Sequence, residues 1–162
     1  MKRVVVIFQA TQQETESLAL AFGLGAVQGG ADIRLRHLDP SPATSLAHAG
    51  YGTLRVADLA WAQGLAIFVE SQDPARLGEL RSALQALAEG PDRGARMVYL
   101  FHRDQTAESF QLLDALASRC GFQRMADIAG LATPGHMNEM GRKMAETEVA
   151  SSETAAISKQ LK

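Results

Sequence analysis

Residues 3–19 read RVVVIFQATQQETESLA, and this stretch decides the fold. The run 4–8 is apolar without interruption, which predicts a strand buried on both faces at the centre of a parallel sheet. A polar segment follows, and apolar residues then recur at helical spacing, with Leu18, Phe22 and Ala26 on one face. Strand, polar loop and helix in this order predict an α/β domain whose ligand site lies at the carboxyl ends of its strands.

The remainder of the chain alternates between strand and helix patterns. Further strands are expected at 31–39, 64–70, 96–101 and within 122–131. A short helix or turn is expected at 56–63. Helices are expected along the stripes Leu77, Leu80, Leu84, Leu87 and Phe110, Leu113, Leu116, and after Thr133-Pro134, where Met137, Met140 and Met144 face inward. Apolar and polar residues alternate only in 31–39, which is typical of a half-exposed edge strand. The pattern predicts helices on both faces of a five-stranded parallel sheet in the order 2-1-3-4-5.

Composition restricts the class of protein. The chain has 162 residues, a formal net charge of −2 and one cysteine, Cys120. We expect one domain over 1–150 and a polar tail over 151–162 that frays. No basic stripe supports nucleic-acid or membrane-surface binding, no apolar run is long enough to span a bilayer, and no cleavage site of a signal peptide is visible. We therefore expect a soluble cytoplasmic protein without an intramolecular disulfide.

Five stretches resemble motifs of the flavodoxin-like superfamily, and most closely those of the flavodoxin-like NAD(P)H:quinone oxidoreductases, the group named after the tryptophan-repressor-binding protein. Residues 8–16 resemble the phosphate loop, 31–36 the second strand, 58–68 the approach to the third strand, 78–84 the helix after it, and 140–145 the last helix. The resemblance implies a three-layer αβα sandwich that binds FMN. It also implies hydride transfer from NAD(P)H through the flavin to a quinone, and a homo-oligomer.

In such a fold the loops after strands 1, 3 and 4 converge and hold the cofactor. The flavin carries the redox chemistry, so we assign no catalytic side chain. The resemblance implies FMN contacts from Thr11, Gln12, Gln13, Thr15, Ser71, Gln72, His102 and Arg103.

All three loops depart from the family pattern. Gln13 stands where the family has glycine, Glu14 adds a carboxylate beside it, and Glu70 lies near the expected flavin ring. The loop 102–105 has no glycine. A carboxylate repels phosphate and can itself occupy the positive end of a helix. Two hypotheses stay open: an FMN-binding oxidoreductase with weakened flavin affinity, or a flavin-free protein of the same fold that acts as a binding or interaction module.

Other candidate sites are weaker. His37, His48 and His136 lack the mutual spacing of metal ligands, so we predict no metal site. Cys120 is expected to serve packing. The spacing of Gly23, Gly25 and Gly29 is similar to a dinucleotide fingerprint, but these residues close a helix instead of opening one, so we interpret the match as chance. A phospho-receiver domain would need acidic residues directly after the first strand, and residues 9–11 supply none. The chain has no Gly-x-Ser-x-Gly elbow, which argues against a hydrolase of that type.

Overall fold

The computed structural model describes residues 1–9, 13–38, 52–69, 77–91, 94–102, 108–125 and 133–147. Its elements, in chain order, are β1 (Arg3–Gln9), α1 (Gln13–Gln28), β2 (Asp32–His37), α2 (Val56–Trp61), β3 (Gly64–Val69), α3 (Gly78–Glu89), β4 (Arg96–His102), α4 (Glu108–Arg119), β5 (Phe122–Arg124) and α5 (Pro134–Glu146). The expected tail over 151–162 lies outside the described residues.

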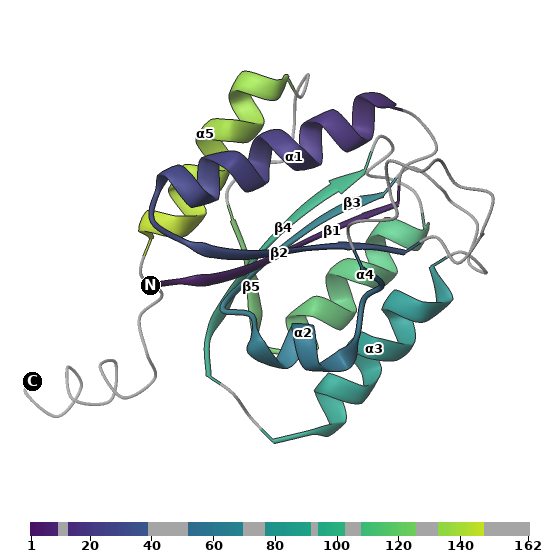
Figure 1. Cartoon of the computed structure of the whole chain (residues 1–162). Helices are drawn as coiled ribbons and strands as arrows, with labels where there is room; N and C mark the ends of the chain where they lie inside the picture. The colour runs from purple at the N-terminus through teal and green to yellow at the C-terminus, as the bar shows by residue number, and fades with distance from the viewer. Residues whose placement is uncertain are drawn as a thin grey trace, which may run out of the picture.

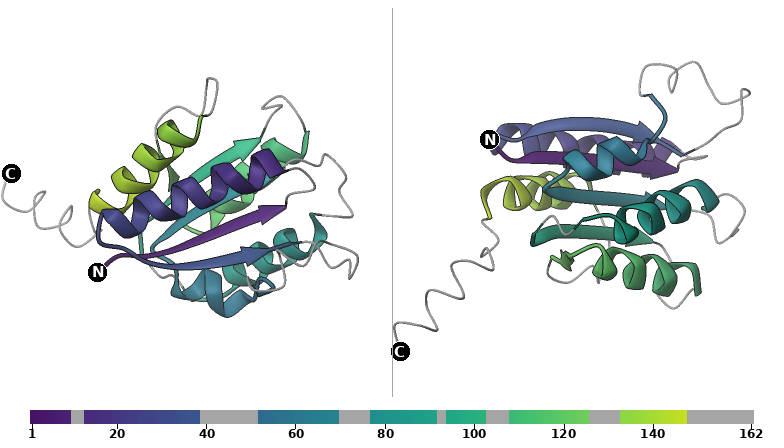
Figure 2. Two further views of the ribbon diagram at one scale, coloured as in Figure 1. Left: turned by 45° about the horizontal axis from the view of Figure 1, so that its top comes forward. Right: turned by 90° about the horizontal axis from the view of Figure 1, so that it is seen from below.

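The five strands form a parallel sheet in the order β2-β1-β3-β4-β5, which confirms the predicted topology. Helices α1 and α5 cover one face, and α2, α3 and α4 cover the other (Figures 1 and 2). The apolar run of β1 is buried on both faces, as predicted. Val4, Val6 and Phe8 pack towards α1 and α5, whereas Val5 and Ile7 pack towards α2, α3 and α4.

An aromatic cluster fixes α1 on the sheet. Phe22 lies with its ring centroid 5.8 Å from Phe68 of β3 and 5.4 Å from Tyr99 of β4. Burial raises the pKa of Tyr99 to about 12, so its phenol stays neutral at physiological pH. The predicted inner face of α5 is also confirmed, because Met137, Met140 and Met144 are buried.

Helix ends lie where the sequence places them. α1 stops at Gln28, and Gly30 adopts a φ of +93°, which only glycine tolerates easily. α5 begins after Thr133, whose hydroxyl accepts a hydrogen bond from the His136 N–H. These local signals set the length of both helices on the α1 face of the sheet.

Helices α1 and α5 approach so closely that three glycines lie between them. A Cβ at Gly25 would overlap the Asn138 carbonyl oxygen, and a Cβ at Gly141 would overlap the Phe22 carbonyl oxygen. A Cβ at Gly29 would lie 2.8 Å from that of Ala145. Gly25 and Gly29, two of the three glycines whose spacing is similar to a nucleotide fingerprint, therefore serve helix packing.

We predict that Gly141→Ala lowers the free energy of unfolding by about 2–3 kcal/mol, because the added methyl meets backbone and forces the helices apart. Urea denaturation followed by circular dichroism measures the change. Gly135→Ala is the matched control on the same helix: nothing lies within 4 Å of its Cβ position. We expect it to be neutral or to stabilise by about 0.5 kcal/mol. Equal effects of the two substitutions would contradict the close contact.

Candidate functional site

The three central strands end side by side at the carboxyl edge of the sheet. Gln9 of β1 pairs in register with Val69 of β3, and Val69 pairs with His102 of β4. The chain therefore leaves β1, β3 and β4 from one row of residues. This is the convergence that the predicted strand order requires, and it defines the candidate site.

The structure describes only some of the predicted FMN contacts. Gln13 opens α1 and His102 closes β4, so the backbone of both adjoins the row of strand ends, while their side chains are not among those described. Thr15 is described completely. The remaining predicted contacts lie outside the described residues: Thr11, Gln12, Ser71, Gln72 and Arg103.

Thr15 is the polar residue that distinguishes this edge. It is the third residue of α1 and is completely buried. Its hydroxyl oxygen has no hydrogen-bond partner among the residues that the structure describes. A buried hydroxyl without a partner costs free energy in a folded protein, so its presence at the start of a helix indicates a ligand group that it could serve.

The electrostatics of this helix end are mixed. The first N–H groups and the dipole of α1 create positive potential at the strand ends, which favours an anion. Glu14 and Glu16 lie in the same turn; Glu14 is exposed and Glu16 is half-buried. Their carboxylates stabilise the helix and oppose a bound phosphate, so the site suits an anion only weakly.

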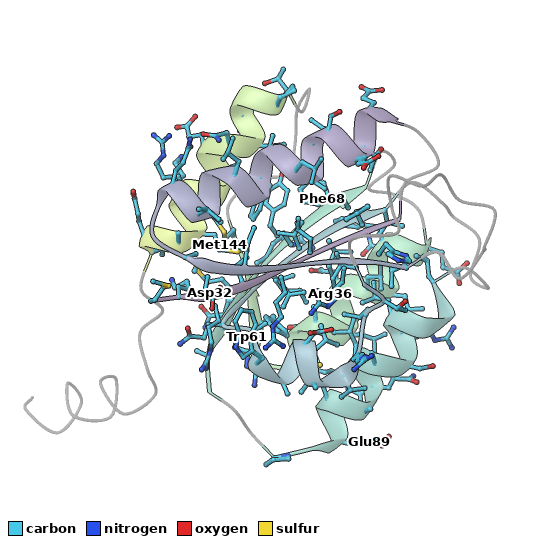
Figure 3. All side chains as sticks on the ribbon, in the orientation of Figure 1. Asp32, Arg36, Trp61, Phe68, Glu89 and Met144 are labelled. Atoms are coloured by element: carbon cyan, nitrogen blue, oxygen red, sulfur yellow. The ribbon has the colours of Figure 1, made fainter. Side chains whose placement is uncertain are left out.

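A second polar cluster lies below β2 and is structural. Asp58 of α2 is 3% exposed and accepts hydrogen bonds from Arg34 Nη1 at 3.1 Å and from Arg36 Nε at 3.0 Å. The Arg34 guanidinium also lies 4.1 Å from the ring centroid of Trp61. Figure 3 shows Arg36 and Trp61 on the α2 side of the sheet. The alternation in β2 therefore reflects apolar residues facing α1 and arginines facing α2, and the strand is half-exposed, as predicted.

The pKa of Asp58 shows that this carboxylate stays ionised. Burial raises its pKa, but the hydrogen bonds from Arg36, the Arg55 N–H and Arg34, together with the Arg36 charge, outweigh burial and lower it below the ordinary 3.8. A carboxylate held ionised by two arginines does not act as a general acid at neutral pH. Sequence patterning missed this cluster; the available signal was a pair of arginines on one side of an edge strand.

A hollow of about 720 Å³ lies at the opposite, amino edge of the sheet, where Lys2, Arg3, Gln63 and Arg96 line it. Two of its cations serve helix ends. Lys2 Nζ donates to the Met144 carbonyl at 3.0 Å, and Arg96 Nη1 donates to the Leu59 carbonyl at 2.9 Å. The positive charge at this edge therefore compensates the carboxyl ends of α5 and α2.

The other sequence candidates have local roles. Cys120 is half-buried, and its thiol donates to the Leu84 carbonyl. Burial raises the pKa of Cys120, which Arg96 and Arg119 only partly offset, so the thiolate is disfavoured. Within the described ranges, no group of three His, Cys, Asp or Glu side chains could hold a metal ion. In the same part of the chain, no helix has the length and apolar character needed to cross a membrane.

Several solved structures of flavodoxins have a similar fold. A flavodoxin from Streptococcus pneumoniae TIGR4 has a TM-score of 0.60 at 10% identity, over 88% of this chain and 97% of that chain. A short-chain flavodoxin associated with a non-canonical PDU bacterial microcompartment has a TM-score of 0.64 at 11% identity, over 90% and 98%. Flavodoxin 2 from Bacillus cereus, in its oxidised form, has a TM-score of 0.58 at 13% identity, over 90% and 99%.

These likenesses show that the chain has a flavodoxin-like fold, as the sequence resemblance implied. No protein-family model and no curated protein matches the sequence.

We predict that Thr15→Val leaves the free energy of unfolding unchanged or raises it by up to about 1 kcal/mol, because it removes a buried hydroxyl that lacks a partner. Thr133→Val is the matched control: it removes a hydroxyl that caps α5 and should cost about 1 kcal/mol. Urea denaturation measures both. A clear loss of stability in Thr15→Val would show that its hydroxyl already has a partner within the protein.

We predict that Asp58→Asn lowers the free energy of unfolding by about 1–3 kcal/mol at pH 7, because two arginines lose their buried counter-ion. The native pKa is lowered, so the contribution of the carboxylate is complete above the unfolded pKa and is lost as the pH falls through the native pKa. The difference from wild type should therefore be constant above about pH 5 and shrink below about pH 4.

Fluorescence of Trp61, the only tryptophan, follows unfolding at each pH. Asp114→Asn is the control, because its ion pair with Arg124 is half-exposed and should contribute less than about 0.5 kcal/mol. A deficit in Asp58→Asn that persists unchanged at pH 3 would contradict the electrostatic role.

Proposed function

We propose that the protein binds FMN at the carboxyl edge of β1, β3 and β4, with the phosphate at the start of α1. Thr15 carries this proposal: its buried hydroxyl lacks a partner in the described part of the chain and lies in the first turn of the helix. A phosphate oxygen would accept a hydrogen bond from that hydroxyl, and the first N–H groups of α1 would add to its binding. The in-register strand ends and the flavodoxin-like fold support the same location.

The affinity for FMN is expected to be weaker than in a site built with glycine and without acids. Gln13 restricts how closely a phosphate can approach the backbone. Glu14 and Glu16 place two carboxylates in the first turn, where they compete with the phosphate for the positive helix end. The sequence resemblance would supply Thr11, Gln12, Ser71, Gln72, His102 and Arg103 as further contacts.

The activity that we propose is electron transfer from NAD(P)H to a quinone. Bound FMN would supply the redox chemistry of this reaction. The protein would bind the flavin, orient it and shield it from water. We assign no catalytic side chain among the described residues.

The second candidate is a flavin-free interaction module of the same fold. The acidic first turn of α1 favours it, since Glu14 and Glu16 stabilise the helix end without any ligand. In that case the strand-end loops would bind a protein partner or a different small molecule. The two candidates differ in one measurable property, the affinity for FMN.

We predict that FMN binds in the micromolar range and that Thr15→Val weakens it by about tenfold or more, because a charge-assisted hydrogen bond is lost. Quenching of flavin fluorescence on titration measures the affinity. Riboflavin lacks the phosphate, so it should bind wild type and Thr15→Val equally. Gln13→Gly combined with Glu14→Asn should strengthen FMN binding in the wild-type background.

Two results would contradict this proposal. Absence of FMN binding at high micromolar concentration, in wild type and in the Gln13→Gly/Glu14→Asn variant alike, would favour the flavin-free module. An equal loss of riboflavin and FMN affinity in Thr15→Val would place Thr15 away from the phosphate. Oxidation of NAD(P)H in the presence of FMN and a quinone then tests the proposed reaction directly.

A further inference from the structure

The exposed face of the short helix α2 is apolar. Its sequence, VADLAW, includes one charged side chain, Asp58, which is turned towards β2 and is 3% exposed. Val56 and Ala57 are exposed, whereas Ala60 and Trp61 are half-buried. A surface helix normally places charged side chains towards water. The exposed side of α2 instead carries Val56, one of the five large apolar side chains that are exposed in the described ranges.

Four arginines border this apolar face. Arg55 directly precedes α2 and is exposed. Arg34 and Arg36 come from β2, on the side that faces α2, and their side chains are 36% and 26% exposed. Arg3, at the start of β1, is exposed, and its guanidinium carbon lies 5.9 Å from the ring centroid of Trp61. We call the exposed face of α2 together with these four arginines the α2 surface.

The α2 surface carries an excess of positive charge. The carboxylates beside the arginines are Asp58, which is buried and already paired, and Asp32, which is exposed at the start of β2 (Figure 3). No carboxylate among the described residues forms an ion pair with Arg3 or Arg55. The formal net charge of the whole chain is −2, so this surface differs in sign from the molecule as a whole. Its potential favours an anionic partner.

Two of the bordering arginines are held in place by the protein itself. Arg34 donates one N–H to Asp58 at 3.1 Å. Arg36 donates one N–H to Asp58 at 3.0 Å and another to the Leu35 carbonyl at 2.9 Å. A guanidinium has five N–H donors, so both arginines keep donors for a carboxylate of a partner. Because these side chains are already ordered, their contribution to binding costs little conformational entropy.

We propose that the α2 surface binds an acidic segment of another protein. An apolar side chain of the partner lies over Val56 and Ala57, and the carboxylates beside it pair with the bordering arginines. Tryptophan and arginine around an apolar centre with a charged border are typical of protein–protein interfaces. The surface follows α2 and β2 and is separate from the strand ends of β1, β3 and β4, so its partner binds without FMN.

A nucleic acid is another polyanion that arginines bind, and two features of the α2 surface argue against it. The exposed Val56 and Ala57 contribute nothing to the binding of phosphate groups. The Arg34 guanidinium already lies over the Trp61 ring, 4.1 Å from its centroid, so that face of the ring is not free to stack on a base. The apolar centre of the surface therefore favours a protein partner.

Fluorescence anisotropy of labelled probes, titrated with the full chain, tests the proposal. For the fluorescein-labelled peptide DEEDLFDEED we expect a dissociation constant on the order of 10–100 µM, which rises as salt is added. The peptide DEEDSSDEED lacks the apolar pair and should bind about tenfold more weakly. The charge-reversed peptide KRRKLFKRRK should not bind. A labelled oligothymidylate of about ten nucleotides should bind more weakly than DEEDLFDEED.

Three results of these titrations would overturn the proposal. One is the absence of DEEDLFDEED binding at about 1 mM protein. The second is equal affinity for the acidic peptides with and without the apolar pair, because the surface would then attract any polyanion. The third is tighter binding of the oligothymidylate than of DEEDLFDEED, which would indicate a nucleic-acid site.

Paired substitutions locate the binding site on the molecule. Arg55→Glu should weaken DEEDLFDEED binding by about tenfold, because it places like charge against the peptide. Arg142→Glu is the control with the same charge change, on an exposed residue of α5 across the sheet. Val56→Ser should weaken binding by about threefold or more, whereas the same substitution at Val27, which is 49% exposed on α1, should not. Equal effects within either pair would exclude the α2 surface.

Amide chemical shifts of the wild-type protein give a measurement that needs no variant. On titration with unlabelled DEEDLFDEED, the largest changes should fall on Arg55, Val56 and Ala57 and on the indole N–H of Trp61. Shifts at these groups that stay constant while the peptide binds would overturn the proposal, because the peptide would then bind elsewhere.

Discussion

The parallel pairing of β1, β3 and β4 in register is the constraint on which the rest of the structure depends. Each of these strands ends opposite its neighbour, at Gln9, Val69 and His102. β3 and the run 4–8 of β1 are buried on both faces. A shift of register by one residue would move each of their side chains to the opposite face of the sheet, where it would no longer fit the helices packed there. The shared strand end is thus enforced by the core, and the candidate site is a consequence of it.

The glycine contact between α1 and α5 determines where the first helix begins relative to that edge. Gly25 and Gly141 let the two backbones touch, and Phe22 anchors the same helix on the aromatic residues of β3 and β4. Both contacts fix the position of α1 along the sheet. The buried hydroxyl of Thr15 belongs to the first turn of α1, which follows the end of β1 and whose dipole attracts an anion.

The sequence predicts the fold well because the fold depends on local patterns. The apolar run of β1, the leucine stripe of α3 and the Thr133-Pro134 helix start each correspond to an element of the structure. Tertiary roles were not predictable in this way. Gly25 and Gly29 matched a nucleotide motif by spacing, and only the position of α5 shows that they serve packing. The ion pairs of Arg34 and Arg36 were not predictable because their partner, Asp58, lies on another element.

The candidate site could be predicted only in part for a related reason. Strand order fixes which loops converge, and periodicity is enough to derive that order. Whether a loop binds a ligand depends on backbone approach and on individual side chains, which no periodic pattern encodes. Thr15 is the exception, since its burial follows from its place on the inner face of α1 and its hydroxyl then needs a partner.

Amide chemical shifts of the protein during an FMN titration test the central claim most directly, because they report which backbone groups sense the ligand. The account predicts that the largest changes fall on the first turn of α1 and on the last residues of β1, β3 and β4, and that Thr15→Val reduces the changes in the first turn of α1. Changes confined to the opposite edge, around Lys2, Gln63 and Arg96, would contradict it.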